Sequence, residues 1–461
     1  MKGKRAAVLG AGVSNMPLIR LLAEAGANII VHDRKTQEAL GEKYGELRAL
    51  GVSFCLGERY LDEISADMIF RSPGIRPDAG GIQRAVRAGA ELTSEMEQFL
   101  QLCPCPVIAV TGSDGKTTTT TLVAEMLTRA GRRCHLGGNI GTPLLDRVPA
   151  MREGDVAVVE LSSFQLMTMK KSPERAVITN ITPNHLNWHA DMDEYTRAKR
   201  NIIAHQDKHG IAVLNADNDV TRDAARLCHG EVRMFSRRGP VENGYYAQNG
   251  KIYQSAGGQT HCVMEETDIF LPGKHNVENY MAAMCAVKGL CGEGAMLETA
   301  REFRGVPHRI ELICEKGGVR YFNDSIASSP ARAIAGLRSF EQKVILIAGG
   351  EDKHVPFDAF GREVAERAKA LILVGLPHEK LKDGKPRAAD AIRRAVEAAE
   401  GFASEKLPIY DFYTMKDAVA KAHEIARRGD VVLLSPACTS FDMYENFVQR
   451  GEDFSALVRA L

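Results

Sequence analysis

The sequence has few aromatic residues and no excess of charge of either sign. Phe, Trp and Tyr make up 6% of the 461 residues, and only one residue is Trp. Lys and Arg together number 59, as do Asp and Glu, so the formal net charge is zero. A chain without an overall positive field has no global attraction for nucleic acid or for an anionic membrane. We therefore expect no nucleic-acid partner, and any anion site must be local.

Long hydrophobic runs are also missing. The first residues, MKGKRAAVLGAG, lead from charge directly into a strand-like segment, without the apolar region of a signal peptide. The ten Cys show no CxxC spacing, and Cys103-Pro104-Cys105 is too tight for the usual structural zinc site. Scattered cysteines of this kind are typical of buried thiols in a reducing cytosol. We expect a cytoplasmic protein that is not inserted in a membrane.

Length and periodicity predict several α/β domains. One hydrophobic core stops growing at roughly 250–300 residues, so this chain should form about three domains. Strand-like runs alternate with helical stretches, which indicates parallel sheets covered by helices. Residues 241–270 are instead short, polar and alternating, and they favour a small antiparallel insertion. We predict an α/β protein with domains at residues 1–95, 96–303 and 304–461, of which the first and the last are Rossmann-like.

The strongest motif is Thr111-Gly112-Ser113-Asp114-Gly115-Lys116-Thr117, which follows a strand-like run and precedes a Thr-rich helix start. Backbone N–H groups at such a turn face an anion, while Lys116 reaches the outer phosphates and Thr117 can hold magnesium. The loop is shorter than the usual consensus, since Val110 stands where that pattern has Gly. Glu160 ends another strand-like run, where a carboxylate suits a cation beside the phosphates. The central domain is therefore predicted to be a P-loop-type ATPase domain with a mainly parallel sheet.

A second Gly-containing turn lies near the N-terminus. Gly10-Ala11-Gly12 followed by Asp33 is similar to a dinucleotide fingerprint, but Asn15 replaces the third Gly. The pattern fits a dehydrogenase, a site for the diphosphate of another nucleotide, or a turn without a ligand. Ser72-Pro73-Gly74-Ile75 follows a further strand-like run, and two turns at strand carboxyl ends would face one crevice.

Other polar residues are ambiguous from spacing alone. His185 and Lys199 are isolated, and a lone His or Lys is usually a surface residue or a satisfied core residue. Arg309 precedes a strand-like run and Asp324 ends the next one, where an α/β domain presents ligand residues, although Asp324 could instead cap a helix. Cys438 has no paired His and Asp nearby, so we do not interpret it as a nucleophile.

Taken together, these motifs resemble the Mur ligases, the amide-forming enzymes of peptidoglycan precursor synthesis, from residue 8 to about residue 454. The most specific sign is the segment SPACTSFD at residues 435–442 with the following Asn446-Phe447-Xaa-Gln-Arg-Gly run. It is similar to the branch of the family that adds D-glutamate rather than diaminopimelate, lysine or a dipeptide. The resemblance implies an ATP- and magnesium-dependent ligase that joins D-glutamate to UDP-N-acetylmuramoyl-L-alanine, and we expect a monomer.

The resemblance also implies a role for individual residues. Catalysis would involve Lys116, His185 and Lys199. ATP would contact Gly112, Asp114, Gly115, Lys116, Thr117, Thr118, Asn276, Arg309 and Asp324. The UDP substrate would contact Ser14, Asp33, Arg34, Ser72, Pro73, Gly74 and Asn139 in the segment Gly138-Asn139-Ile140-Gly141, and D-glutamate would contact Ser328, Lys353, Ser440, Phe441 and Phe447. Two magnesium ions would be held by Thr117, Glu160, His185 and a carbamylated Lys199.

One position departs from the family pattern, since Ile326 stands where some relatives carry Lys. The implied reaction activates a carboxylate as an acyl phosphate, and we expect the third domain to close on the second after nucleotide binds. A folylpolyglutamate synthase would share the phosphate loop but not the N-terminal Gly-rich domain or the SPACTSFD segment. A nicotinamide dehydrogenase would leave Glu160 and Lys199 unexplained, and a nucleotide-binding switch would need no amino-acid pocket.

Overall fold

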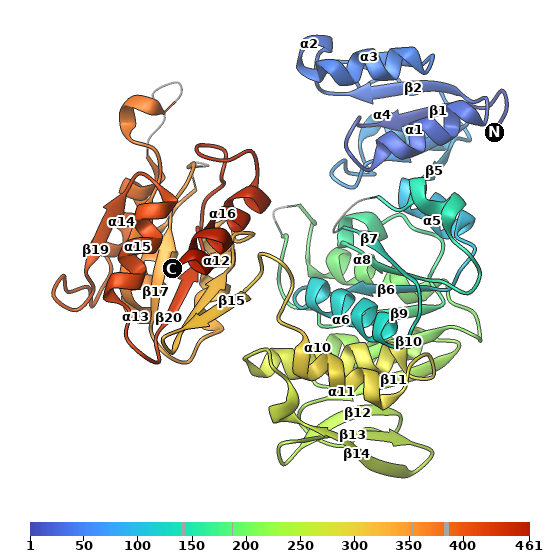
Figure 1. Ribbon diagram of the computed structural model, residues 1–461. Helices are drawn as coiled ribbons and strands as arrows, with labels where there is room; N and C mark the ends of the chain where they lie inside the picture. Colours follow the sequence, from blue (N-terminus) through green and yellow to red (C-terminus); the bar gives the residue numbers. More distant parts are fainter. Residues whose placement is uncertain (140–142, 187, 353–354, 382–386) are drawn as a thin grey trace. The chain divides into compact units, whose positions relative to one another are not determined.

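The computed structural model describes residues 1–139, 143–186, 188–352, 355–381 and 387–461 (Figure 1). The chain divides into two compact units. The first contains Met1–Ile269 and Lys274–Glu302, and the second contains Phe270–Gly273 and Phe303–Leu461. Within the described residues, no helix combines the length and the apolar character needed to cross a bilayer. All cysteines of this part of the chain are reduced thiols, as predicted.

The N-terminal segment forms a parallel sheet with the strand order β3-β2-β1-β4-β5. Its strands are β1 (Arg5–Leu9), β2 (Asn28–Asp33), β3 (Ser53–Leu56), β4 (Met68–Arg71) and β5 (Glu91–Thr93). The helices are α1 (Asn15–Glu24), α2 (Gln37–Leu40), α3 (Glu42–Ala49), α4 (Gly80–Arg87) and α5 (Glu95–Leu102). The chain runs outward in opposite directions from β1 and β4, and the crevice at such a reversal is where open α/β sheets bind ligands.

The central sheet has the order β14-β13-β12-β11-β10-β9-β6-β8-β7. Its strands are β6 (Val107–Thr111), β7 (Cys134–Gly138), β8 (Val156–Glu160), β9 (Arg175–Ile178), β10 (Ile211–Asn215), β11 (Glu231–Ser236), β12 (Gly244–Gln248), β13 (Lys251–Ala256) and β14 (Gln259–Glu265). The pairing is parallel from β7 to β12 and antiparallel in β12-β13-β14. The antiparallel segment predicted at residues 241–270 is confirmed, and it extends the central sheet because β12 pairs with β11.

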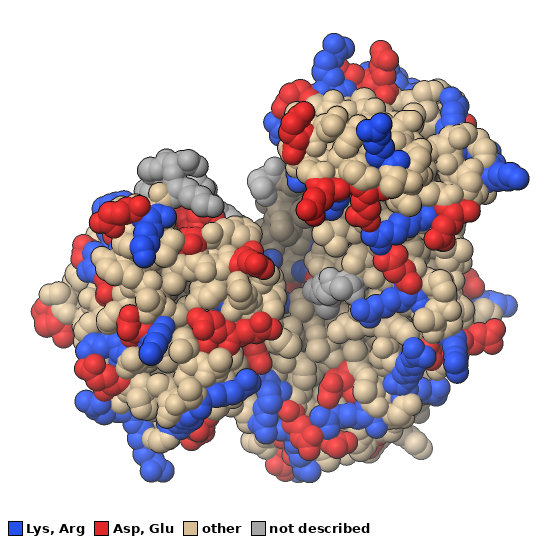
Figure 2. All heavy atoms as spheres, turned by 45° about the horizontal axis from the view of Figure 1, so that its top comes forward, with Lys and Arg blue, Asp and Glu red and all other residues tan. Residues whose placement is uncertain are grey.

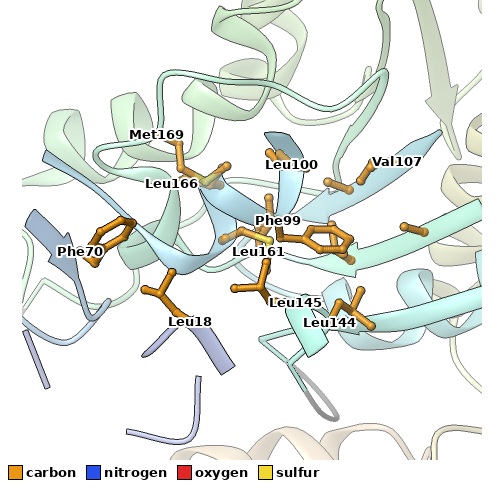
Figure 3. Packing of buried hydrophobic residues seen from close by; sticks show 14 of the residues in the cluster. Leu18, Phe70, Phe99, Leu100, Val107, Leu144, Leu145, Leu161, Leu166 and Met169 are labelled. Atoms are coloured by element: carbon orange, nitrogen blue, oxygen red, sulfur yellow. The ribbon is translucent and has the colours of Figure 1, made fainter. Parts of the chain in front are cut away.

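Helices and apolar side chains hold the central sheet in place. The helices are α6 (Lys116–Arg129), α7 (Ser163–Leu166), α8 (Met192–Ala204), α9 (Asp219–Asp223), α10 (Lys274–Val287) and α11 (Glu293–Glu302), with 3₁₀ turns η1 (Leu145–Ala150), η2 (Ala224–Leu227) and η3 (Glu266–Asp268). α6 packs beside α10 (Figure 1). Figure 3 shows Phe99, Leu145 and Leu161 gathered in a buried cluster that extends to Leu18 of α1 and Phe70 of β4. One continuous core therefore joins the first sheet to the central one.

The second unit contains a sheet with the order β15-β16-β20-β17-β18-β19, in which β15 pairs antiparallel and the other strands pair in parallel. Its strands are β15 (Glu311–Lys316), β16 (Val319–Asn323), β17 (Val344–Ala348), β18 (Ala368–Val374), β19 (Ile409–Phe412) and β20 (Val431–Leu434). The helices are α12 (Pro330–Arg338), α13 (Asp358–Arg367), α14 (Ala388–Glu397), α15 (Met415–Ile425) and α16 (Phe447–Ala460), with the 3₁₀ turn η4 (His378–Lys380).

Both faces of this sheet are buried. Leu346 and Ala348 of β17 belong to one apolar cluster, whereas Ile345 and Ile347 belong to another. Successive side chains of a strand point to opposite faces, so a strand covered on both sides must be apolar throughout. The predicted α/β fold is confirmed. On the surface facing the reader in Figure 2, acidic and basic side chains are interspersed, in keeping with the balanced charge.

Candidate functional site

The turn between β6 and α6 has a backbone shape that requires glycine. Gly112 and Gly115 have φ of 152° and 79°, in the region that side chains disfavour. A Cβ atom at Gly112 would overlap Thr179 Oγ1, and one at Gly115 would overlap Asn279 Oδ1. The Asp114 N–H donates to Asn180 Oδ1 at 2.9 Å. Residues directly after β9 and a residue of α10 therefore fix the loop. The N-terminus of α6 at the end of the loop can bind an anion.

Lys116 begins α6, and its ammonium group lies over the same loop. Nζ donates to the carbonyl oxygens of Gly112 and Ser113 at 3.0 and 2.9 Å. Ser113 Oγ shares a hydrogen bond with Tyr195 OH at 2.9 Å and so connects the loop to α8. A lysine ammonium group beside a glycine-containing loop and a helix N-terminus is the arrangement that binds terminal phosphates.

Thr117 and Glu160 meet at the carboxyl edge of the central sheet. Thr117 Oγ1 donates to Glu160 Oε2 at 2.6 Å, and Asn139 Nδ2 donates to Glu160 Oε1 at 2.8 Å. Gly138 has a φ of 96°, and a Cβ there would overlap the Glu160 carbonyl. Ile140 and Gly141 lie outside the described residues. The hydroxyl and carboxylate oxygens fit magnesium, which prefers oxygen ligands.

The described residues contribute only part of a metal's coordination shell. Among the described residues, no group of three or more His, Cys, Asp and Glu side chains could hold a metal ion. Magnesium commonly keeps one or two protein carboxylates and completes its shell with water and substrate phosphates. Thr117 and Glu160 match that mode beside the phosphate loop.

Lys199 lies under the phosphate loop, although its spacing in the sequence left its role open. It comes from α8, is buried, and donates to the Gly112 carbonyl at 2.6 Å. Burial lowers the pKa of the Lys199 amine well below its ordinary value, and the charge of Lys116 lowers it further. A lowered pKa increases the share of the amine that is uncharged, and the uncharged amine is the nucleophilic form.

His185 lies in the segment between β9 and α8. Its backbone has a φ of 55°, a strained value for a residue with a side chain. Its ring lies 5.0 Å from Phe164 and 6.4 Å from Tyr195, measured between centroids. The structure thus brings His185 next to α7 and α8, which carry Phe164 and Lys199.

Asn276 is buried near the start of α10, where its Oδ1 accepts from Asn279 Nδ2 at 3.1 Å. Asn279 Oδ1 accepts in turn from Thr119 Oγ1 of α6 at 3.3 Å. Our sequence reasoning missed Asn279. The only available signal was an Asn pair three residues apart on one helical face.

The two turns of the first sheet lie together, as predicted. Asn15 Nδ2 donates to the Gly10 carbonyl at 2.8 Å and to Ser72 Oγ at 3.0 Å. Asp33 Oδ2 accepts from the Ala11 N–H at 2.7 Å. Asn15, which replaces the third Gly of the fingerprint, therefore joins both turns. Of the remaining candidates there, Ser14 is the N-cap of α1 and Arg34 forms an exposed ion pair with Glu58.

In the second unit, Asp324 is buried at the end of β16. Its Oδ2 accepts from Ser435 Oγ at 2.8 Å, and burial raises its pKa to about 7. Arg309 acts in the opposite direction, since its charge lowers that pKa. Asp324 follows its strand directly and does not act as the N-cap of α12, which is Ser329.

The contacts of Arg450 and Gly451 give the Gln-Arg-Gly run a structural role. The buried Arg450 guanidinium donates to the carbonyl oxygens of Ser325 and Cys438 at 2.8 and 3.2 Å. A Cβ at Gly451 would overlap His308 Nδ1. The run thus connects the segment after β16 to the SPACTSFD segment, a role that we did not assign from the sequence.

The amino-acid candidates lie around these same segments. Ser328, Glu351, Phe357 and Cys438 line a small cavity. Ser440 is buried, whereas Phe441 is 64% exposed. Phe447 begins α16, and its carbonyl accepts from Ser325 Oγ at 2.8 Å. Lys353 lies outside the described residues.

Comparisons with known proteins match the successive parts of this chain to one family. Family models match residues 4–94 (Mur ligase MurD-like, N-terminal domain), 110–287 (Mur ligase middle domain) and 308–438 (Mur ligase, glutamate ligase domain). The chain is 45% identical over 462 residues to the UDP-N-acetylmuramoylalanine--D-glutamate ligase of Clostridium novyi and equally to that of Ruminiclostridium cellulolyticum. These alignments cover 100% of this chain and 98% and 97% of those proteins, respectively.

Solved structures show the same fold at low identity. The UDP-N-acetylmuramate-alanine ligase of Thermotoga maritima is 18% identical, with a TM-score of 0.54 and 99% of each chain covered. The UDP-N-acetylmuramoylalanyl-D-glutamyl-2,6-diaminopimelate--D-alanyl-D-alanyl ligase of Acinetobacter baumannii is 17% identical, with a TM-score of 0.56, covering 87% of this chain and 91% of that one. With three domain models matched in order and full-length relatives at 45% identity, the chain belongs to the Mur ligase family of ATP-dependent ligases.

Proposed function

We propose that this protein joins D-glutamate to UDP-N-acetylmuramoyl-L-alanine, with ATP converted to ADP and phosphate, in peptidoglycan precursor synthesis. The observation that carries the proposal is the 45% identity, over the full length of both chains, to ligases named for this reaction. The phosphate loop with the Thr117–Glu160 contact supports the ATP-dependent half of the reaction. The Arg450 contacts that order the SPACTSFD segment support a specific amino-acid site.

We assign one ligand to each part of the chain. Residues 1–95 would bind the UDP substrate through Ser14, Asp33, Arg34, Ser72, Pro73 and Gly74, and Asn139 of the central part would also contact it. Residues 96–303 would bind ATP through Gly112, Asp114, Gly115, Lys116, Thr117, Thr118 and Asn276, with Arg309 and Asp324 contributed by residues 304–461. D-Glutamate would contact Ser328, Lys353, Ser440, Phe441 and Phe447. We also propose a cytoplasmic monomer.

The chemistry follows from these assignments. The substrate carboxylate attacks the γ-phosphorus of ATP, ADP leaves, and an acyl phosphate forms. The amine of D-glutamate then attacks the acyl carbon, loses a proton, and displaces phosphate as the amide forms. Lys116 and the loop N–H groups stabilise charge on the transferred phosphoryl group. Magnesium held by Thr117, Glu160 and His185 would neutralise phosphate charge when bound.

We further propose that Lys199 is carbamylated. The neutral amine would attack carbon dioxide, form an N–C bond and release one proton, which leaves a carbamate anion in place of the amine. The lowered pKa of Lys199 supports this step, because only the neutral amine is nucleophilic. A carbamate there would add an oxygen ligand beside Glu160 for a second magnesium ion. Labelled bicarbonate should give a carbamate carbon signal that is missing in Lys199→Gln.

The function is tested by phosphate release from ATP and magnesium in the presence of UDP-N-acetylmuramoyl-L-alanine. D-Glutamate is compared with L-glutamate, L-lysine and meso-diaminopimelate. Release with D-glutamate alone is expected. Release with a different amine, or without the UDP substrate, would keep the ligase fold but overturn the named substrate.

A further inference from the structure

A hydrogen-bond network connects the first sheet to the segment that carries His185. Arg76 follows the turn at residues 72–74, and its two Nη atoms donate to the Glu194 carboxylate at 2.9 and 3.2 Å. Nη1 also donates to the Trp188 carbonyl at 2.5 Å. The hydrogen bonding from Arg76 is the main reason that the pKa of Glu194 is lowered to about 2. Both members of this pair are therefore charged near neutral pH. The pair is also bidentate, so its two hydrogen bonds fix the orientation of one side chain relative to the other.

The network continues from Glu194 to α7. Glu194 Oε2 accepts from the Ala190 N–H at 2.9 Å and lies 3.2 Å from His189 Nδ1. Nε2 of the buried His189 lies 2.9 Å from Ser163 Oγ. Glu194 therefore holds three points at once: the first sheet through Arg76, the segment before α8, and α7.

Arg71 connects the same elements from the other side of the turn. Its buried guanidinium donates to the carbonyl oxygens of Pro73 and Ile75 at 3.1 and 2.7 Å, and to that of Phe164 at 2.7 Å. The turn at residues 72–74 is thus fixed at both ends, by Arg71 before it and by Arg76 after it. Arg71 reaches α7 and Arg76 reaches α8, the two helices beside His185.

The aromatic side chains of this region form one cluster of contacting rings. Trp188, the single tryptophan of the chain, lies 4.5 Å from Phe164 and 4.8 Å from His189 between ring centroids. The Arg76 guanidinium carbon lies 5.1 Å from the Trp188 centroid. Phe164 also contacts His185. We therefore expect a change in the Arg76 link to reach the single tryptophan and the His185 segment.

We propose that Arg76 and Glu194, acting through His189, are positioning residues for the ligation. They fix the position of the turn at residues 72–74 relative to the His185 segment, so that a substrate bound at the turn presents its carboxylate at the phosphate loop. The described residues of the His185 segment, 179–186 and 188–191, belong to no strand or helix, and His185 has a positive φ, so we infer that side-chain links determine the segment's position. The inference rests on the proposed function.

The test compares Arg76→Ala, Arg76→Lys and Glu194→Gln with the control Arg59→Ala. Arg59 forms an exposed ion pair with Asp62 at 2.7 Å within the first sheet domain, so its loss removes a similar charge away from the network. Steady-state rates are measured against the UDP substrate and against ATP. Acrylamide quenching of Trp188 and the melting temperature are measured on the same samples.

Arg76→Ala and Glu194→Gln should lower kcat/KM for the UDP substrate about 10- to 100-fold, since misplaced groups cost rate in this range, while KM for ATP changes less than about twofold. Arg76→Lys should recover part of the loss, because it keeps the charge but not the bidentate geometry. Quenching of Trp188 should rise in Arg76→Ala and stay unchanged in Arg59→Ala.

A lower melting temperature with unchanged kcat/KM would show a merely structural role and overturn the proposal. Equal losses for ATP and for the UDP substrate would overturn it as well. Wild-type protein that releases no phosphate with D-glutamate would refute the proposed function and this inference together. Wild-type turnover matched by Arg76→Ala would refute the inference alone.

Discussion

At the scale of single residues, the two glycines that flank α6 allow the cost of backbone strain to be measured apart from the cost of steric overlap. Gly115 precedes the helix with a φ of +79°, and Gly131 follows it with a φ of +77°. An added Cβ would overlap Asn279 Oδ1 at Gly115, whereas it would meet nothing within 4 Å at Gly131. The two positions thus share the φ penalty, about 1–2 kcal/mol, and differ only in their surroundings.

We therefore expect Gly131→Ala to lower stability by about that penalty and leave KM for ATP unchanged. Gly115→Ala should carry the same loss and also raise KM for ATP at least tenfold, because Asn279 must move away from the loop. Chemical denaturation and ATP titration measure both effects. Equal KM values in the two variants would show that the Asn279 contact does not shape the loop.

Asp324 makes stability depend on pH in a defined direction. Burial raises its folded-state pKa from 3.8 to about 7, so the folded state binds a proton more tightly than the unfolded state. This contribution is complete below pH 3.8 and is lost as the pH rises through about 7. At 1.36 kcal/mol per pKa unit, the loss approaches about 4 kcal/mol.

Asp324→Asn should remove that dependence, because the amide still accepts from Ser435 but has no charge to bury. The free energy of unfolding, measured without nucleotide from pH 5 to pH 8, should decline in the wild type and decline less in the variant. Parallel curves for the two proteins would mean that Asp324 titrates normally in the folded state.

At the scale of elements, two helical glycines have opposite surroundings. Gly451 of α16 packs against His308 and Asn323, whereas Gly294 of α11 is exposed with nothing within 4 Å of an added Cβ. Gly inside a helix lowers stability by roughly 0.5–1 kcal/mol relative to Ala, so it is retained where close packing requires it. α16 therefore approaches β16 as closely as a helix lacking a side chain allows.

The same substitution should act with opposite sign at these positions. Gly294→Ala should raise the free energy of unfolding by about 0.5–1 kcal/mol. Gly451→Ala should lower it by about 1–3 kcal/mol, through overpacking against His308. It should also raise KM for D-glutamate, since Arg450 next to it orders the SPACTSFD segment. A stabilising effect of Gly451→Ala would contradict the close packing of α16.

At the scale of the whole molecule, each apolar cluster of the described residues lies within one unit or the other. One cluster joins the first and central sheets, and two other clusters cover the faces of the third sheet. Cooperative unfolding extends over one continuous core, so the chain should not unfold in a single two-state step. Calorimetry should resolve at least two transitions, and saturating ATP analogue should shift them unequally. One transition with equal calorimetric and van't Hoff enthalpies would contradict this.

The sequence by itself determined the features that are local. The strand, turn and helix start around Lys116 are contiguous in the chain, so glycine positions and periodicity are enough to predict the phosphate loop. The alternating pattern likewise predicted buried parallel strands, and the polar segment at residues 241–270 predicted antiparallel pairing. These features depend on backbone preferences that act over a few residues.

Only the tertiary structure decided which distant residues meet. Glu160 reaches Thr117 because β8 pairs with β6, and Lys199 reaches Gly112 because α8 packs under the loop. Arg76 and Glu194 are 118 positions apart in the sequence, and neither belongs to a recognisable motif. Strand order and the burial of charged groups arise from packing the whole chain, so no local pattern specifies them.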